Sequence, residues 1–313
     1  MFSVASDKNL YDLIIVGAGP AGISAGIYAA RANINCCIIE GSAPGGKVLK
    51  TGIIENYAGI NKKTGPDLAL EMLNQINELK VPVIYSHVLS VEKLENYFIV
   101  FLSNKTNVFA KSVIVATGTN ERAMNTPGEE RFFNKGISYC AICDGALYKN
   151  KDVAVVGGGN AAVEEAAYLA GIVNKLYLVH RRDEFRADAY AVEQLKKYQN
   201  VEYLLSYVPE KVEGQTVVEK FVVRSVKDNS LKFIEVSCIF PYIGAIPATK
   251  FVESLKITDS NGYIQANHAM ETSVPGLFAA GDCIAKKYRQ ISTAVSDGTI
   301  AALNAKEYLN KIK

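Results

Sequence analysis

The segment CAICD, from Cys140 to Asp144, places two cysteines and an acid within one short turn of chain. Zinc would need four ligands, and the sequence offers neither a second such pair nor two suitably spaced histidines. Inert core cysteines would fit the apolar neighbours, but the Asp-Gly step that follows is typical of a turn or helix start near the surface. We therefore expect Cys140 and Cys143 to form a redox-active dithiol. Asp144 is placed to donate or relay the proton that thiol–disulfide exchange needs.

The composition is that of a globular protein with room for two domains. Its 313 residues are 49% hydrophobic and 21% charged, which is enough apolar material for proper cores. The 34 basic and 32 acidic residues give a net charge of +2, so nothing favours nucleic acid or an anionic membrane as a partner. Six cysteines are too few for a disulfide scaffold and indicate a reducing compartment.

One stretch near the N-terminus, residues 13–30, is uncharged over nearly the length of a membrane span. Several glycines and a proline interrupt it, so a strand, a tight turn and a helix fit it better than a membrane helix. Asp7 and Asp12 lie where a signal peptide would be apolar. We predict a soluble, cytoplasmic protein.

The elements that must bring electrons to the cysteines begin in this stretch. A short β-branched strand leads into the pattern Gly17-x-Gly19-x-x-Gly22, and a helix and a second apolar strand follow. In a dinucleotide-binding unit the first glycine makes the turn, the second lets the backbone approach a pyrophosphate, and the third lets helix and strand pack closely. The second strand ends at Glu40, where an acid can accept hydrogen bonds from a ribose diol. We expect this unit to bind the adenosine of FAD or NAD.

The same layout recurs 140 residues later as Gly157-x-Gly159-x-x-Ala162, again between two apolar strands. At the position equivalent to Glu40 the second unit has His180 instead of an acid. Two different dinucleotide sites in one chain indicate a flavoprotein that takes hydride from a nicotinamide.

Basic residues follow this histidine directly, with Arg181 and Arg182 next in the chain and Arg186 one turn further on. An acid would repel a 2′-phosphate, whereas arginines can bind one through bidentate, charge-assisted hydrogen bonds. A solvated basic patch is the alternative, but the position at a strand end argues against it. We therefore expect the second unit to bind NADPH.

Two polar, turn-rich segments indicate where the chain crosses between domains. One follows the strand 112–116 at Thr117-Gly118, and the other follows the strand that ends near Tyr242. The fold class that results is α/β, with two Rossmann-like, doubly wound, three-layer domains. The expected FAD-binding domain is residues 1–118 and 248–313, with the NADPH-binding domain, residues 119–247, inserted and carrying the cysteine pair.

The chain returns to the first domain with a strand, Leu277 to Ala280, that ends at Gly281-Asp282. A carboxylate directly after a strand is well placed to bind flavin hydroxyls. An aspartate in a turn or at a helix cap is the alternative reading of Asp282.

The order of the motifs GAGPAG, CAICD, GGGNAA with HRRDEFRA, AAGDC and YRQ closely resembles that of the low-molecular-weight, bacterial-type thioredoxin reductases. These belong to the pyridine nucleotide-disulfide oxidoreductases, and the resemblance spans nearly the whole chain. It implies a homodimer that moves electrons from NADPH through tightly bound FAD to the cysteine pair and then to thioredoxin. It also implies that Cys143 faces the flavin, that Cys140 attacks thioredoxin, and that Asp144 is the acid.

The fingerprints and the resemblance together imply which residues hold the two cofactors, and they imply no metal. For FAD these are Gly17, Gly19, Pro20, Ala21, Gly22, Glu40, Gly45, Gly46, Lys47, Asn56, Ala116, Thr117, Gly118, Gly281, Asp282, Arg289, Gln290 and Ile291. For NADPH they are Gly157, Gly159, Asn160, Ala161, Ala162, His180, Arg181, Arg182, Arg186, Ile243 and Gly244. The chain departs from the family pattern at Lys47, where glutamine is usual, and at Ile291, where alanine is common.

Three other functions remain open at this stage. A ferredoxin- or flavodoxin-type reductase would not need the cysteine pair, and a dithiol oxidase would not need a 2′-phosphate site. A redox-sensing flavoprotein that docks a partner would be distinguished by its lack of turnover. The remaining cysteines are expected to be buried and without chemistry, namely Cys36, Cys37, Cys238 and Cys283.

Overall fold

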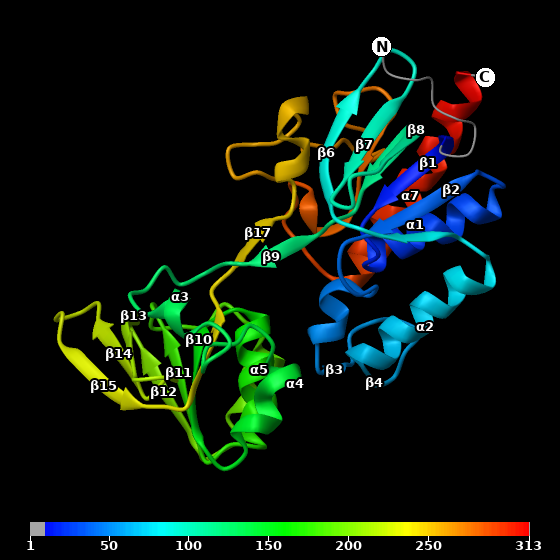
Figure 1. The fold of residues 1–313 in the computed structure, drawn as a ribbon. Coiled ribbons are helices and arrows are strands. Elements are labelled where there is room, and N and C mark those ends of the chain that lie inside the picture. Colours follow the sequence, from blue (N-terminus) through cyan, green and yellow to red (C-terminus); the bar gives the residue numbers. More distant parts are fainter. Residues whose placement is uncertain (1–9, 313) are drawn as a thin grey trace. The chain divides into compact units, whose positions relative to one another are not determined.

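The computed structural model describes residues 10–312, so Asp7 lies outside the described residues. The chain forms two compact units (Figure 1). The first comprises the residues up to Asn120 and those from Ile246 onward, and the second, Glu121–Ala245, is inserted between these two segments.

The two segments that join the units are β9 (Thr119–Glu121) and β17 (Ala245–Pro247), and they pair as a two-stranded sheet. Further hydrogen bonds flank this pairing. The Ala248 N–H donates to the Gly118 carbonyl at 3.1 Å, and the Arg122 N–H donates to the Gly244 carbonyl at 3.0 Å. The two crossings are therefore one hydrogen-bonded structure rather than two independent loops.

The first unit is built on a sheet whose neighbouring strands run in the order β5-β2-β1-β8-β7-β6, with β18 paired to the later part of β8. Strands β5, β2, β1, β8 and β18 are parallel, and β7 and β6 extend from the start of β8 as an antiparallel meander. Its strands are β1 (Leu10–Val16), β2 (Cys36–Glu40), β3 (Ile53–Ile54), β4 (Lys63–Thr64), β5 (Val83–Tyr85), β6 (Val88–Lys93), β7 (Phe98–Leu102), β8 (Asn107–Val115) and β18 (Leu277–Ala279).

Helices cover this sheet, and α1 packs against α7, which returns from the far end of the chain (Figure 1, blue and red). The α-helices are α1 (Pro20–Arg31), α2 (Gly65–Glu78) and α7 (Ile291–Lys311), and the 3₁₀ helices are η2 (Gly46–Lys50), η4 (Lys250–Leu255) and η5 (Gly281–Cys283). Leu13, Ile14 and Ile15 are fully buried, as expected for a central parallel strand covered on both faces. The uncharged stretch 13–30 is a strand, a turn and a helix that begins at a proline, as predicted. Within the described part of the chain, no helix is both long and apolar enough to cross a membrane.

The second unit combines a parallel sheet, in the order β12-β11-β10-β16, with an antiparallel sheet, β13-β14-β15. Its strands are β10 (Asp152–Gly157), β11 (Lys175–His180), β12 (Val201–Leu205), β13 (Tyr207–Glu213), β14 (Lys220–Ser225), β15 (Leu231–Glu235) and β16 (Cys238–Tyr242). Its helices are α3 (Glu129–Phe132), α4 (Ala141–Asp144), α5 (Asn160–Ala170), α6 (Ala189–Leu195) and the 3₁₀ helix η3 (Gly145–Tyr148).

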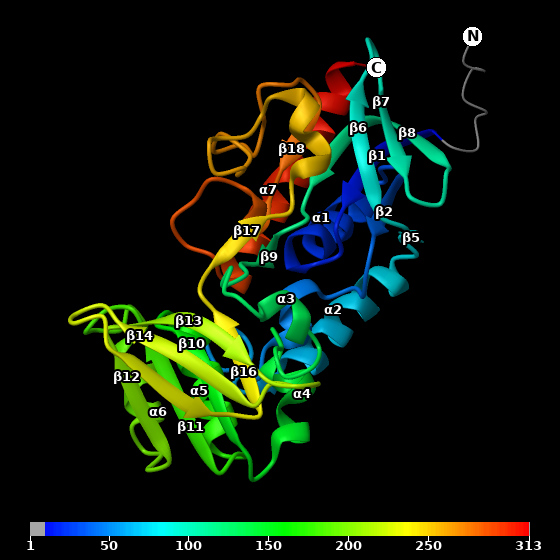
Figure 2. The same cartoon turned by 60° about the vertical axis from the view of Figure 1, so that its left-hand side comes forward.

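Strand β10 shows how the layers of this unit form. Val153 and Val155 pack into a core with helix α5, while Ala154 and Val156 pack into a second core with β14 and β15. The alternation is that of a strand buried on both faces. The antiparallel sheet thus covers one face of the parallel sheet and the helices cover the other (Figure 2).

The two parallel sheets share one register. In the first unit Leu13 pairs with Cys36, and in the second Val153 pairs with Leu176, each residue 140 positions later. The same offset holds through the end of both strand pairs, where Val16 pairs with Ile39 and Val156 with Val179. The sequence repeat is therefore also a structural repeat.

Candidate active site

The cysteine pair lies at the start of α4 in the second unit. Cys140 is the N-cap residue of this short helix, and a disulfide joins it to Cys143. The Cys143 backbone N–H donates to the Cys140 sulfur at 3.2 Å. Cys140 is 8% exposed, whereas Cys143 is exposed. A hydrogen bond to a sulfur favours its thiolate form, so the N–H is placed to stabilise Cys140 once the disulfide is reduced.

Asp144 is held beside the pair by a residue that the sequence did not point to. The Ser138 hydroxyl donates to Asp144 Oδ2 at 2.6 Å, and Ser138 Oγ accepts the Cys140 N–H at 3.1 Å. One buried serine thus links the acid to Cys140 of the redox pair.

In the first unit the glycines act as the pattern predicts. Gly17 has a φ of +104°, and a Cβ there would lie 2.5 Å from the Ala116 carbonyl oxygen. A Cβ on Gly22 would lie 1.8 Å from the Gly17 carbonyl oxygen, so helix α1 could not approach the strand with any larger residue. A Cβ on Gly19 would meet nothing within 4 Å, which leaves open space where a pyrophosphate would pass.

Glu40 ends strand β2 at the edge where this turn begins. Its Oε2 accepts the Ala18 N–H and its Oε1 accepts the Ser42 N–H, both at 2.7 Å. A carboxylate has about four acceptor positions. Two bonds therefore fix the side chain, and acceptor capacity remains for a ribose diol.

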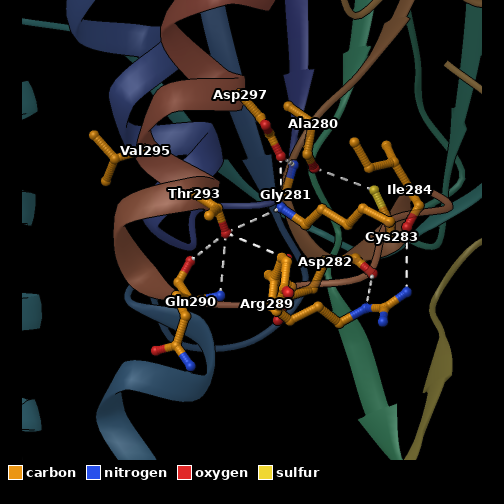
Figure 3. Close-up of polar contacts among 12 residues, drawn as sticks. Ala280, Gly281, Asp282, Cys283, Ile284, Arg289, Gln290, Thr293, Val295 and Asp297 are labelled. Carbon is orange, nitrogen blue, oxygen red and sulfur yellow. Dashed lines mark hydrogen bonds and ion pairs between the residues drawn. The ribbon is translucent and has the colours of Figure 1, made fainter. Parts of the chain in front are cut away.

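The end of β18 supplies the clearest sign that a polar ligand belongs in the first unit (Figure 3). Asp282 Oδ1 is buried and has no hydrogen-bond partner among the described residues. Burial raises the pKa of this carboxyl above its ordinary value, against the opposing charges of Lys286 and Lys47. A buried carboxylate oxygen left unpaired costs free energy. The hydroxyls of a flavin side chain would satisfy it, so the residues present fit FAD.

The loop that carries Asp282 is tied to α7 by an ion pair that the sequence did not reveal. Asp297 Oδ2 accepts the Gly281 N–H at 3.0 Å and lies 2.6 Å from Lys286 Nζ. Both charged side chains are largely buried, being 13% and 15% exposed. The pair fixes the Gly281–Asp282 turn against the first turns of the helix (Figure 3).

Arg289 and Gln290 complete this corner. The Arg289 guanidinium donates to the Asp282 and Ile284 carbonyls, each at 3.3 Å, and lies 4.3 Å from the ring centre of Tyr263. Gln290 caps α7 in a reciprocal capping box with Thr293 (Figure 3).

The other expected FAD residues flank the same turns. Pro20 and Ala21 open α1, Gly46 and Lys47 open η2, and Ile291 opens α7, while Ala116, Thr117 and Gly118 follow β8. The Gly45 N–H donates to the Ala18 carbonyl at 2.7 Å, which brings η2 to the fingerprint turn. Asn56 lies in an exposed loop between β3 and β4.

In the second unit two of the three arginines line one pocket. Arg182 and Arg186 border a hollow of about 340 Å³ with the residues between them. The Arg186 N–H donates to the Gly158 carbonyl at 2.7 Å, which folds this loop back onto the fingerprint turn. Arg181 is exposed and is not part of the pocket lining. Asp183, Glu184 and Phe185 complete the lining, so the two guanidinium groups share the hollow with two carboxylates. The arginines are the groups that could bind a 2′-phosphate there.

His180 differs from its neighbours because its ring is buried, being 5% exposed. The ring stacks on Phe185 at 5.7 Å and lies where a Cβ on Gly158 would approach it to 2.4 Å. Burial lowers its pKa, and the arginines around it lower the pKa further. The histidine thus supports the fingerprint turn from within.

The remaining expected NADPH residues lie around the same turn. Gly157, Gly159, Ala161 and Ala162 form the fingerprint and the start of α5, and Ile243 and Gly244 follow β16. The Asn160 amide is engaged with Asp188, donating to its Oδ2 at 2.6 Å and accepting its N–H at 2.8 Å. The other four cysteines are buried and free, as predicted.

Comparison with known proteins decides the family. Residues 11–298 match the family described as pyridine nucleotide-disulphide oxidoreductase. The thioredoxin reductase of Mycoplasma pneumoniae is 50% identical over 307 residues, covering 98% of each chain. The chain belongs to the pyridine nucleotide-disulphide oxidoreductases, as a low-molecular-weight thioredoxin reductase.

Solved structures agree with this assignment. The Lactococcus lactis thioredoxin reductase in its FR conformation superimposes with a TM-score of 0.94 at 37% identity, covering 96% of this chain and 99% of that one. The thioredoxin reductase of T. acidophilum gives a TM-score of 0.92 at 31% identity, covering 97% and 100%. The predicted fold class is confirmed, and so is the thioredoxin reductase activity, with Cys140–Cys143 as its redox pair.

Proposed function

We propose that this thioredoxin reductase passes electrons from NADPH, bound by the second unit, through FAD, bound by the first, to the Cys140–Cys143 disulfide and then to thioredoxin. The observation that carries the proposal is the difference between two equivalent strand ends. One has the acid Glu40 with spare acceptor capacity, and the other leads into a loop in which Arg182 and Arg186 line a pocket together with the residues 183–185. An acid suits a ribose diol and arginines suit a 2′-phosphate.

The first unit holds the flavin through its glycine turn, Glu40, and the Asp282 corner. Bound FAD would supply the two electrons that open the disulfide. Asp282 would accept hydrogen bonds from the flavin side chain, and Lys286 and Asp297 would keep its loop in place. Lys47, unusual for the family, lies close enough for its charge to act on Asp282.

The chain's own residues then carry out thiol–disulfide exchange. The Cys140 thiolate attacks one sulfur of the thioredoxin disulfide, which forms a mixed disulfide and releases the other thioredoxin sulfur as a thiolate. The Cys143 thiolate attacks the Cys140 sulfur, restoring the internal disulfide and releasing the second thiolate. Asp144 gives its proton to one of these leaving thiolates, and solvent protonates the other.

Cys140 can attack thioredoxin only if the chain around it opens locally. In the disulfide form Cys140 is buried and Cys143 is exposed. The proposed role of Cys140 therefore requires the turn at α4 to open after reduction. The resemblance to the family, rather than this exposure, supports the assignment. It also supports a homodimer and a cytoplasmic location, which we propose on that ground alone.

The test is NADPH-dependent reduction of a thioredoxin disulfide by the purified yellow protein, with NADH as the control nucleotide. Turnover should require Cys140 and strongly prefer NADPH. The variant Cys143→Ser should trap a mixed disulfide with thioredoxin through Cys140, whereas Cys140→Ser should not. If NADPH bleaches the flavin but thioredoxin is not reduced, the protein is a flavoprotein and the thioredoxin step of the proposal is wrong.

A further inference from the structure

One buried hydroxyl connects the acid to the redox pair. Ser138 is 6% exposed and lies two residues before Cys140. Its Oγ donates to Asp144 Oδ2 at 2.6 Å and accepts the Cys140 N–H at 3.1 Å. A second possible acceptor, the Cys140 carbonyl, lies 3.4 Å away. The Ser138 hydroxyl can therefore donate its hydrogen bond either to Asp144 or to the Cys140 carbonyl.

The backbone of the serine is anchored to the sheet, while its side chain bonds the redox turn. Its backbone N–H donates to the Ile239 carbonyl of β16 at 3.1 Å, next to a bridge between Ile137 and Ile239. The redox turn is fixed separately, because the Ala141 N–H donates to the Tyr242 hydroxyl at 3.0 Å. The Ser138 hydroxyl therefore keeps its position while Asp144 gains or loses a proton.

We propose that Ser138 is a positioning residue that orients the Asp144 carboxyl for proton transfer during thiol–disulfide exchange. The proposal rests on the proposed function, in which Asp144 protonates a leaving thiolate. While Asp144 is ionised, the Ser138 hydroxyl donates to it, and a donor to the charged form favours that form.

The protonated acid is accommodated without movement of heavy atoms. A hydroxyl has one donor and two acceptor positions. When Asp144 carries its proton, that O–H can donate to Ser138 Oγ while the serine proton turns to the Cys140 carbonyl. Transfer then breaks the Asp144 O–H bond and forms an S–H bond on the leaving thioredoxin sulfur, and the serine proton turns back to the carboxylate.

The experiment uses the FAD-loaded enzyme, reduced with NADPH and then mixed with oxidised thioredoxin across a pH series. For Ser138→Ala we expect reduction of thioredoxin to slow about tenfold at neutral pH. The limb of the pH–rate profile that depends on Asp144 should also shift, because the hydroxyl that bonds its carboxylate is lost. Bleaching of the flavin by NADPH should be unchanged, since it does not use this serine.

Conservative variants separate positioning from folding. Ser138→Thr keeps a hydroxyl and should restore the rate and the pH limb. Ser138→Cys keeps the volume with a weaker donor and should shift the limb part of the way, even if Ser138→Ala proves unstable. Ser112→Ala is the matched control, because it also removes a buried hydroxyl, one that donates to the Gly276 carbonyl at 2.9 Å. It should leave the pH limb unmoved.

The outcomes distinguish this proposal from the proposed function. If Ser138→Ala loses the same fraction of its rate at every pH and Ser138→Thr does not recover it, the serine only supports the turn and the proposal is wrong. An unchanged rate and limb would overturn it as well. If Asp144→Asn keeps the wild-type pH profile, the acid role of Asp144 in the proposed function fails, whatever Ser138 does. In Asp144→Asn, the further change Ser138→Ala should cost nothing more.

Discussion

The two βαβ units of this chain share their strand register residue for residue, yet they differ at the end of the second strand. In the first, Glu40 accepts a backbone N–H from Ala18 in the fingerprint turn. In the second, the equivalent His180 has no such bond, and its ring packs over Gly158. One backbone arrangement therefore carries an acid at this position in one unit and a buried histidine in the other.

A second difference accompanies the first. Ala18 in the first unit corresponds to Gly158 in the second. Alanine therefore accompanies Glu40, and glycine accompanies His180. The carboxylate needs only a backbone N–H, so Ala18 is tolerated. The imidazole ring occupies the space that a Cβ at position 158 would need. Two positions far apart in each unit's sequence are thus coupled by packing.

The largest expected effect comes from removing the arginines of the second unit. The double variant Arg182→Ala with Arg186→Ala should lower kcat/KM for NADPH by roughly 10²–10⁴-fold, because each of two charge-assisted hydrogen bonds contributes about 1.5–3 kcal/mol. The value for NADH should barely change, since NADH has no 2′-phosphate. Steady-state kinetics with both nucleotides measures this. Equal losses for both would place the arginines outside the 2′-phosphate site.

The packing difference can be tested with a reciprocal pair. Gly158→Ala should destabilise the protein by about 1–3 kcal/mol, because the new Cβ overlaps the buried His180 ring. It should also weaken NADPH binding, since Arg186 bonds the Gly158 carbonyl. Ala18→Gly, the matched control, should cost about 1 kcal/mol or less through lost burial and added backbone freedom. Chemical denaturation compares them, and equal costs would contradict the coupling.

Much of this arrangement could be predicted from the sequence. Glycine spacing, flanking apolar runs and the strand-end acid identified both units, because each signal is local to some thirty residues. The buried state of His180 could not be predicted, since it depends on Phe185 and on the open backbone of Gly158. Ser138 beside Asp144 and Lys286 beside Asp297 belong to no motif. Their roles arise from contacts that only the folded chain makes.

In the first unit, the buried carboxylate of Asp282 links FAD binding to stability. Burial raises the pKa of this carboxyl, so its ionised form costs free energy in the protein without FAD. Asp282→Asn removes that charge at nearly constant shape. Thermal unfolding of the FAD-free variant should therefore occur at higher temperature than for the FAD-free wild type, while its dissociation constant for FAD should rise about tenfold. A variant that is less stable and binds FAD normally would show that Asp282 serves folding instead.

The smallest effect concerns pH. Burial lowers the pKa of His180, so the unfolded chain binds this proton more readily than the folded chain does. The neutral ring's contribution to stability is fully present above about pH 6.5, the pKa in the unfolded chain. It is lost as the pH falls from there through the lower pKa of the folded protein. His180→Gln should flatten the dependence of the unfolding free energy between pH 7 and 5 by at most about 1.4 kcal/mol per pH unit. Urea unfolding across this range measures it, and parallel curves would argue against a buried neutral ring.

We propose that the acid-ended unit holds FAD and that the arginine-ended unit takes NADPH. The FAD content of the purified protein, together with the rate of flavin bleaching by NADPH and by NADH under anaerobic conditions, tests both assignments. We expect one FAD per chain and bleaching that is much faster with NADPH. Two FAD molecules per chain, or equal rates with the two nucleotides, would contradict it.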